Sequence, residues 1–216
     1  MKIFSRLTIF LSLILFSCGS QSKEEMITGV WEFNDEERHR TRIIEFASDS
    51  TTSRGSAKWW FSETENKLCV KEDHRENPDC STLVSISDDG MSMCIENRNK
   101  LMCGNKIDET ITKDMIVGKW LNNNYNSNSW GYECYEFNED GFMYPNCKPY
   151  PSDEPKIYHE KWKISDNKKY IIIKSGQESG PGSEPSSIYV KNITKLKLEI
   201  FGACSRDKFC ELVKYE

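Results

Sequence analysis

Cysteine is the residue type in this chain that offers the most chemistry, because a thiol can be a nucleophile, a metal ligand or half of a disulfide. The chain has nine cysteines. Cys18 ends an apolar N-terminal segment, and the other eight are spread over the rest of the chain: Cys69, Cys80, Cys94, Cys103, Cys134, Cys147, Cys204 and Cys210. None belongs to a CxxC motif, and no Cys/His pair has zinc-site spacing, so we expect neither a redox centre nor a bound metal. An even number of cysteines in an exported chain instead predicts a disulfide framework.

The other residues that could support catalysis do not form a recognisable set. The histidines, His39, His74 and His159, are widely separated, and the carboxylates are scattered through predicted turns. Residues 180–183 combine glycines with a serine but lack the GxSxG pattern of a nucleophile placed between a strand and a helix. No glycine-rich loop has the pattern that holds a phosphate. The sequence therefore predicts a protein that is not an enzyme and that uses no cofactor.

The first 17 residues have the features of an export signal. Lys2 and Arg6 supply positive charge, and residues 7–16 form an apolar run too short to cross a bilayer core of about 30 Å. Leu15-Phe16-Ser17-Cys18 resembles the lipobox of bacterial lipoproteins, in which a small residue precedes the cleavage site and the cysteine thiol accepts a diacylglyceryl group. The resemblance implies cleavage before Cys18 and a lipid anchor on that residue. The alternative is an ordinary signal peptide with a stray cysteine, or a short membrane anchor.

The chain that would remain after cleavage is acidic. It keeps 27 basic and 34 acidic residues, a net charge of −7, and it has no clustered Lys/Arg face, so nucleic acid is not an expected partner. Residues 18–25 are polar and predict a tether without a core-forming pattern. Within this tether, residues 22–25 resemble the Lys-plus-acidic signals that send lipoproteins to the outer face of the outer membrane. The alternative is that these residues are only a soluble tether and carry no sorting signal. We therefore expect a lipid-anchored protein of the cell envelope, at the outer membrane, on its periplasmic or surface face.

The sequence contains two copies of one pattern. The matched segments are residues 25–31 with 114–120, 43–46 with 134–137, and 58–62 with 161–165. Their offset grows from 89 to 91 to 103, as expected if the second copy has longer loops, and each copy holds four cysteines. The matches predict two homologous domains, at residues 26–107 and 115–216. The linker at residues 108–114 is short, so the two domains should lie close together.

The pattern of each copy predicts a series of β-strands. Apolar residues alternate with polar ones, so that Trp31 and Phe33 share one face, as do Trp59 and Phe61, and turn signals recur every eight to twelve residues. No segment has a helical period longer than about two turns, although residues 108–115 could form a short helical turn. The predicted fold class is all-β, with two tandem small antiparallel meander barrels of about seven or eight strands each. Such small sheets avoid open edges most simply by closing into barrels.

Strand pairing also predicts which cysteines are joined. A hairpin that turns at Arg98 and Asn99 places Cys94 opposite Cys103, and the last two cysteines can join the matching hairpin of the second copy. The predicted pairs are Cys94–Cys103, Cys204–Cys210 and, from the cysteines that remain, Cys69–Cys80 and Cys134–Cys147. Cys69 and Cys134 fall between inward-facing apolar residues, so their bridges should lie on the outer wall. Their expected role is to stiffen small domains with thin cores.

Ile27-x-Gly29-x-Trp31 and Ile116-x-Gly118-x-Trp120, each opening a β-meander, resemble the GxW signature of the lipocalin (calycin) superfamily. They look most like the short lipocalin-like domains of lipoproteins from Bacteroidetes-type bacteria. The resemblance implies that Gly29 and Gly118 let the first strand bend, and that Trp31 and Trp120 plug the closed end of each barrel. Each copy departs from the family in three ways: it is about half the length of a ligand-carrying lipocalin, it lacks the TDxxY turn, and no basic residue is an evident match for the Arg that packs on the Trp. A narrower barrel could be filled by its own aromatic side chains.

Two functions follow from these features. The first is a lipid-anchored cell-envelope binding protein that holds a small hydrophobic ligand in one or both barrels. The alternative is a protein-interaction or inhibitor module that presents surface loops, such as residues 122–131 or 176–187, and has no ligand cavity. Trp60 is expected to point outward and Trp130 lies in an Asn/Ser-rich loop, so both are candidate contact residues. A lumen open at one end would favour the ligand carrier, and a filled lumen beside an exposed aromatic residue would favour the interaction module.

Overall fold

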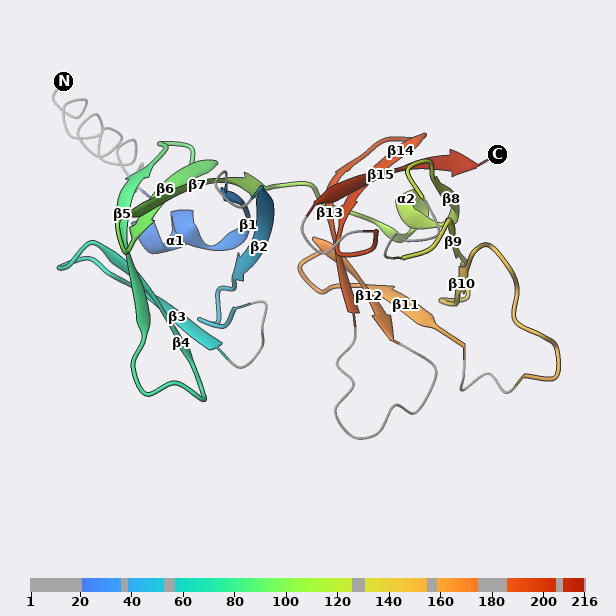
Figure 1. The fold of residues 1–216 in the computed structure, drawn as a ribbon, viewed down its shortest axis with the longest axis horizontal. Helices are drawn as coiled ribbons and strands as arrows, with labels where there is room; N and C mark the ends of the chain where they lie inside the picture. Colours follow the sequence, from blue (N-terminus) through green and yellow to red (C-terminus); the bar gives the residue numbers. More distant parts are fainter. Residues whose placement is uncertain are drawn as a thin grey trace, which may run out of the picture.

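The computed structural model describes residues 21–35, 39–52, 57–125, 131–154, 159–174, 186–204 and 208–215. The protein is all-β apart from two short helices, as the sequence predicts. Its strands form two antiparallel sheets that lie side by side along the long axis of the molecule (Figure 1).

The first sheet closes into a small barrel. Its seven strands are β1 (Gly29–Asp35), β2 (Arg40–Phe46), β3 (Ala57–Ser62), β4 (Lys67–Glu72), β5 (Asp79–Ile86), β6 (Ser92–Asn97) and β7 (Lys100–Ile107). Their order is β2-β1-β7-β6-β5-β4-β3, so the first strand also pairs with the last. Residues 51 and 52 join the two outer strands, because Thr52 bridges to Phe46 of β2 and Thr51 bridges to Lys58 of β3. The meander therefore leaves neither β2 nor β3 as a fully open edge.

The second sheet closes in the same way. Its eight strands are β8 (Gly118–Asn122), β9 (Cys134–Phe137), β10 (Met143–Pro145), β11 (Lys161–Ile164), β12 (Tyr170–Lys174), β13 (Ser186–Ile193), β14 (Lys197–Phe201) and β15 (Phe209–Tyr215). Their order is β10-β9-β8-β15-β14-β13-β12-β11. The outer strands meet where the N–H of Met143 donates to the carbonyl of Glu160 (2.9 Å) and the N–H of Trp162 donates to that of Gly141 (2.8 Å). When residues 51–52 are matched with β10, the two sheets have the same strand connectivity.

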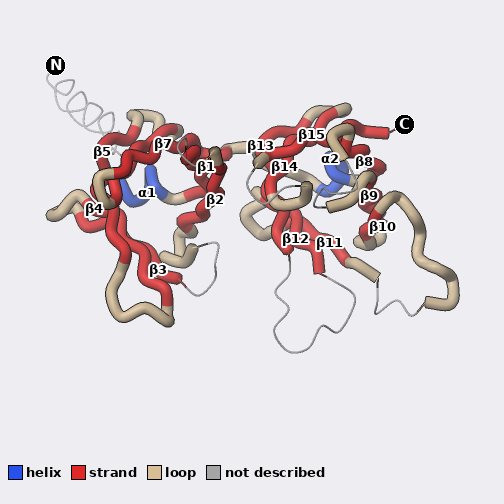
Figure 2. The backbone as a smooth tube through the Cα atoms, in the orientation of Figure 1, coloured by secondary structure: helices blue, strands red, loops and turns tan. Residues whose placement is uncertain are grey.

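A short helix precedes each barrel: α1 (Lys23–Ile27) and α2 (Lys113–Ile116). Figure 2 shows each helix, in blue, among the red strands of its own barrel. The position of α2 agrees with the helical turn predicted within residues 108–115. The tether expected over residues 18–25, in contrast, does not extend to residue 25. Ser22 caps α1 by accepting from the N–H of Glu25 (3.2 Å), and Glu25 accepts from the N–H of Ser22 (2.9 Å). This Ser-x-x-Glu capping box stabilises a helix too short to show a hydrophobic period.

Each barrel has its own apolar core. The first core consists of Ile27, Trp31, Phe33, Phe46, Trp59, Leu68, Leu83, Met93 and Ile95, none more than 5% exposed. The second consists of Ile111, Ile116, Trp120, Tyr135, Phe137, Met143, Trp162, Ile171, Ile173, Ile188, Val190, Ile193, Leu198, Ile200 and Leu212, none more than 8% exposed. Ile111 comes from the segment predicted as a linker, so this segment contributes to the second core. Its N–H donates to the carbonyl of Lys168 (3.0 Å).

Four disulfides join the cysteine pairs predicted from the sequence: Cys69–Cys80, Cys94–Cys103, Cys134–Cys147 and Cys204–Cys210. Cys94 and Cys103 face each other across a hairpin whose turn residues, Arg98 and Asn99, both have positive φ, as a two-residue hairpin turn requires. Cys204–Cys210 differs from that arrangement. Cys204 lies between β14 and β15, Cys210 is opposite Ile200, and both cysteines pack against the core. This bridge therefore covers one end of the barrel.

The two barrels touch one another. Lys191 of β13 approaches Glu32 of β1, with 3.0 Å between Nζ and Oε2, and Asn167 donates a hydrogen bond to Glu45 of β2. Burial raises the pKa of Glu45 at this contact, although the hydrogen bond from Asn167 opposes the shift. On the outward face of β1, Val30 is 1% exposed and Glu32 is 7% exposed.

Candidate functional site

The GxW motif closes one end of each barrel. Gly29 has φ = +141° and Gly118 has φ = +131°, a backbone conformation that other residues rarely adopt. Two residues later, Trp31 and Trp120 are fully buried. Each indole N–H donates to the last carbonyl of the adjacent helix: Trp31 to Ile27 (2.6 Å) and Trp120 to Ile116 (2.7 Å). In each barrel the glycine, the tryptophan and the short helix therefore form one closed end.

A lysine from the last strand covers each of these tryptophans. Lys106 pairs with Trp31 in the strand register and places Nζ 5.1 Å from its ring centroid, and Lys214 does the same to Trp120 at 5.2 Å. Lys106 also donates to the carbonyl of Met26 (2.6 Å), and burial lowers the pKa of its ammonium group. Residue spacing alone did not identify these lysines, because strand register determines their position. The available signal was a lysine in the last strand of each copy.

The interior of each barrel is filled by side chains. In the first barrel, Phe46 packs edge-on against Trp59 with 5.3 Å between ring centroids, and Trp31 stacks near Phe33 at 6.3 Å. The second barrel is also covered at the end opposite α2. There the Tyr135 hydroxyl donates to the carbonyl of Ala203 (2.9 Å), and a Cβ on Gly131 would lie 2.0 Å from that same oxygen. The described aromatic and aliphatic side chains thus occupy the interior of each barrel.

Two open hollows adjoin the second barrel. They have volumes of about 360 and 430 Å³ and adjoin the β9–β10 turn and α2. The first is lined by Val117, Gly118, Glu136, Phe137, Asn138, Glu139 and Asp140, and the second by Lys113, Asp114, Val117 and Glu139. The first lining has three acidic residues and no basic one, and the second combines Lys113 with two acidic residues, so neither resembles an apolar ligand site.

Trp60 lies on the outer wall of the first barrel, as predicted. It is 38% exposed, whereas its neighbour Trp59 is 2% exposed and points inward. Trp60 is opposite Cys69, which is in turn opposite Cys80, so the disulfide lies directly beside the indole. Lys58 and Lys71 are opposite each other two positions away, and both are exposed. We call this group, Lys58, Trp60, Lys71 and the Cys69–Cys80 disulfide, the Trp60 face.

A second polar cluster covers the end of the second barrel opposite α2. The Tyr132 hydroxyl donates to Oε1 of Glu160 (3.1 Å), and the Tyr150 ring stacks on His159 with 4.1 Å between centroids. Burial raises the pKa of Glu160, although the bond from Tyr132 opposes this, and burial also raises the pKa of Tyr135 to about 12. Oε2 of Glu160 and Nε2 of His159 are buried without hydrogen bonds, since Glu154 approaches His159 only to 4.0 Å. Sequence reasoning missed this cluster because its members are far apart in the chain.

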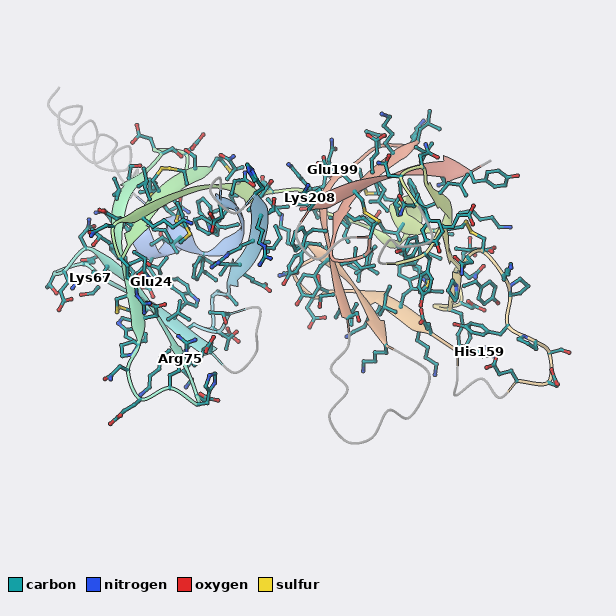
Figure 3. The ribbon with its side chains drawn as sticks, in the orientation of Figure 1. Glu24, Lys67, Arg75, His159, Glu199 and Lys208 are labelled. Carbon is teal, nitrogen blue, oxygen red and sulfur yellow. A yellow bond between two sulfur atoms is a disulfide. The ribbon has the colours of Figure 1, made fainter. Side chains whose placement is uncertain are left out.

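Among the described residues, this cluster has no nucleophile beside Glu160. Its tyrosines stay protonated at neutral pH, and Glu160 activates no serine, cysteine or lysine among the described residues. Figure 3 shows His159 on the same side of the molecule as Arg75 of the β4–β5 loop.

Over the described ranges, no group of three or more His, Cys, Asp or Glu side chains could hold a metal ion. None of the helices there has the length and apolar character needed to cross a membrane.

No known family model matches this chain. A search of curated proteins likewise finds no significant match to the sequence. Two site residues predicted from the sequence, Cys18 and Trp130, lie outside the described residues, as does most of the loop at residues 176–187. The described residues thus form two closed barrel ends, two packed interiors and the exposed Trp60 face.

Proposed function

We propose that this chain is a cell-envelope lipoprotein that binds a protein partner through the outer surface of two packed β-barrels. The observation that carries this proposal is the filling of both barrels by their own aromatic and aliphatic side chains. A small hydrophobic ligand would need an apolar space in the lumen, whereas a partner protein needs only an exposed anchor such as Trp60. Of the two functions considered from the sequence, the interaction module is therefore the better supported.

We further propose that both barrels are lipocalin-like and arose as repeats of one domain. The GxW motif occurs at the same place in each, with the same positive φ at the glycine and the same indole bond to the preceding helix. The lysines that cover Trp31 and Trp120 take the place of the arginine that packs on the tryptophan in that superfamily. The matching strand connectivity of the two sheets supports the same interpretation.

The proposed anchor is lipid on Cys18, exposed after removal of residues 1–17. Three residues separate Cys18 from Ser22, the N-cap of α1. A span of four residues reaches at most about 14 Å, so the closed end of the first barrel would be held near the membrane. Four disulfides suit the oxidising environment outside the cytoplasm. Residues 22–25 are consistent with an outer-membrane address, although Ser22 and Glu25 also cap α1.

Metabolic labelling with a palmitate analogue tests the anchor. The full-length chain expressed in a diderm bacterium should incorporate the label and fractionate with membranes, and the Cys18→Ala variant should do neither. An unlabelled wild-type chain would exclude lipidation.

Mass spectrometry of the purified protein tests the mode of binding. The mature chain carrying Cys18→Ser, exported so that its disulfides form, should yield no stoichiometric lipid on organic extraction. A lipid recovered at one or two molecules per chain would instead establish the carrier function.

A further inference from the structure

The Trp60 face contains two lysines that repel one another. Lys58 and Lys71 are direct cross-strand partners on β3 and β4, and both side chains point outward. Like charges placed directly opposite on adjacent strands are destabilising. A chain with excess acidic residues could readily have placed a carboxylate at either position. This arrangement therefore suggests that an anion from outside the molecule compensates the two charges.

Two acidic residues of the β3–β4 hairpin already have other partners. Glu65 pairs with Lys67 (3.0 Å), which Figure 3 shows at the outer edge of the first barrel. Glu72 follows Lys71 in the sequence but pairs with Arg75 (2.9 Å). Across the described ranges, neither Lys58 nor Lys71 forms an ion pair. The positive charge on this face is consequently available to a ligand.

Trp60 supplies an apolar contact at a defined distance from the two charges. It is two positions from Lys58 on the same face of β3, a separation of about 7 Å along the strand. Trp is among the residues that contribute most to protein–protein binding energy, and the disulfide beside it provides a rigid support. The face is part of a barrel wall and is formed by lysines and one indole. It lacks the several aromatic platforms and amide side chains that a polysaccharide site would use.

We propose that the Trp60 face binds an extended acidic segment of a protein partner. The segment would place a carboxylate between Lys58 and Lys71 and an apolar side chain two residues away on Trp60, because residues i and i+2 of an extended chain face the same side. This inference rests on the proposed function and adds the chemistry of the partner. It requires no lipid and no open lumen.

The second barrel provides a matched control. Lys161 and Lys174 are opposite each other on β11 and β12, as Lys58 and Lys71 are on β3 and β4. The position equivalent to Trp60, next to the inward-facing Trp162, is occupied by Lys163. This second face therefore has the paired lysines without the indole.

Selection from a displayed library of random linear peptides tests the proposal, with the mature Cys18→Ser chain as the target. The selected peptides should combine Asp or Glu with an aromatic or aliphatic residue two positions away. Their affinity should fall at least about ten-fold for Lys58→Gln/Lys71→Gln and for Trp60→Ala, and should weaken as salt rises. Lys161→Gln/Lys174→Gln should change it by less than about two-fold. Peptides without acidic residues, or equal losses in both lysine pairs, would overturn the assignment.

Two further measurements separate the remaining outcomes. The Lys58→Gln/Lys71→Gln variant should unfold at the same urea concentration as the parent or at a higher one, because the substitutions remove a repulsion. A clear loss of stability would overturn the inference, because it would mean that the lysines have a structural role.

Heparin serves as a polysaccharide probe. Heparin binding that requires all three side chains, without any selected acidic peptide, would overturn the protein-partner proposal. If the purified chain contains lipid, the proposed function itself fails. If it is lipid-free but selects no acidic peptide, only this inference fails.

Discussion

Single residues explain why each barrel closes at the GxW end. Gly29 and Gly118 adopt positive φ, and the lysine stem from the last strand occupies the space beside each glycine before its ammonium group reaches the tryptophan. The side chain at the middle position, Val30 or Lys119, points the other way. Only the glycine and the tryptophan are therefore constrained by this end of the barrel, as the motif itself suggests.

Gly118→Ala should destabilise the protein by about 1–3 kcal/mol, because φ near +131° is strained for any residue with a Cβ. The new Cβ would also lie 2.9 Å from Cε of Lys214, but that flexible side chain can move. Urea unfolding measures the change. Adding Lys214→Ala should not restore the lost stability, and full recovery in the double variant would show that crowding, not backbone strain, is the cause.

Glu160→Gln should make the protein more stable at pH 7 but leave it unchanged near pH 4. Burial raises the pKa of Glu160 in the folded state, so wild-type stability is highest while this group is protonated and falls as the pH rises from about 4.5 through the folded-state pKa. Glutamine keeps an acceptor for Tyr132 and carries no charge. Urea unfolding at several pH values measures the difference, with Glu139→Gln at an exposed turn as the control. A variant less stable than the wild type at pH 7 would contradict the account.

Secondary-structure elements were predictable from the sequence wherever the pattern was periodic. Alternation of apolar and polar residues predicted which side chains of β1, β3 and β6 point into the barrel. The hairpin at Arg98 and Asn99 predicted that Cys94 lies opposite Cys103. Helix α1 was missed because five residues are too few for a hydrophobic period, although its capping box was present in the sequence. The Tyr132–Glu160 cluster and the lysines over the tryptophans depend on which loops and strands meet, and that information is not local. The exposure of Trp60 followed from alternation, but the unpaired lysines beside it required the register.

The disulfides should differ in how much they contribute. Replacing Cys94 and Cys103 with alanine opens a loop of about ten residues and should cost about 2–3 kcal/mol. Replacing Cys204 and Cys210 opens a shorter loop, yet it should cost more, because these two cysteines also pack against the second core. Urea unfolding of the two double variants gives their order. The reverse order would mean that the Cys204–Cys210 bridge contributes little beyond the constraint on its loop.

At the scale of the whole molecule, the two barrels are held together by polar contacts on β1 and β2. Lys191→Met should destabilise this arrangement by about 1–3 kcal/mol, because it leaves the buried carboxylate of Glu32 without its cation. The equivalent change at Lys197, whose pair with Glu211 is exposed on both sides, should cost less than about 0.5 kcal/mol. Calorimetry of both variants tests the difference, and Glu32→Met should recover part of the loss in the Lys191→Met background. Equal effects at the two lysines would argue against a stabilising contact between the barrels.

We propose that both barrels are packed inside and that a partner binds on the outer wall. Methyl-resolved NMR of the mature Cys18→Ser chain, titrated with a saturated fatty acid and separately with a selected acidic peptide, distinguishes this arrangement from a ligand carrier. We expect the core methyl groups of Leu83, Ile95, Ile173 and Leu198 to keep their chemical shifts with the fatty acid, and the peptide to shift the Trp60 indole resonance and signals around it. Saturable shifts of those core methyl groups on adding the fatty acid would contradict the account and restore the ligand carrier.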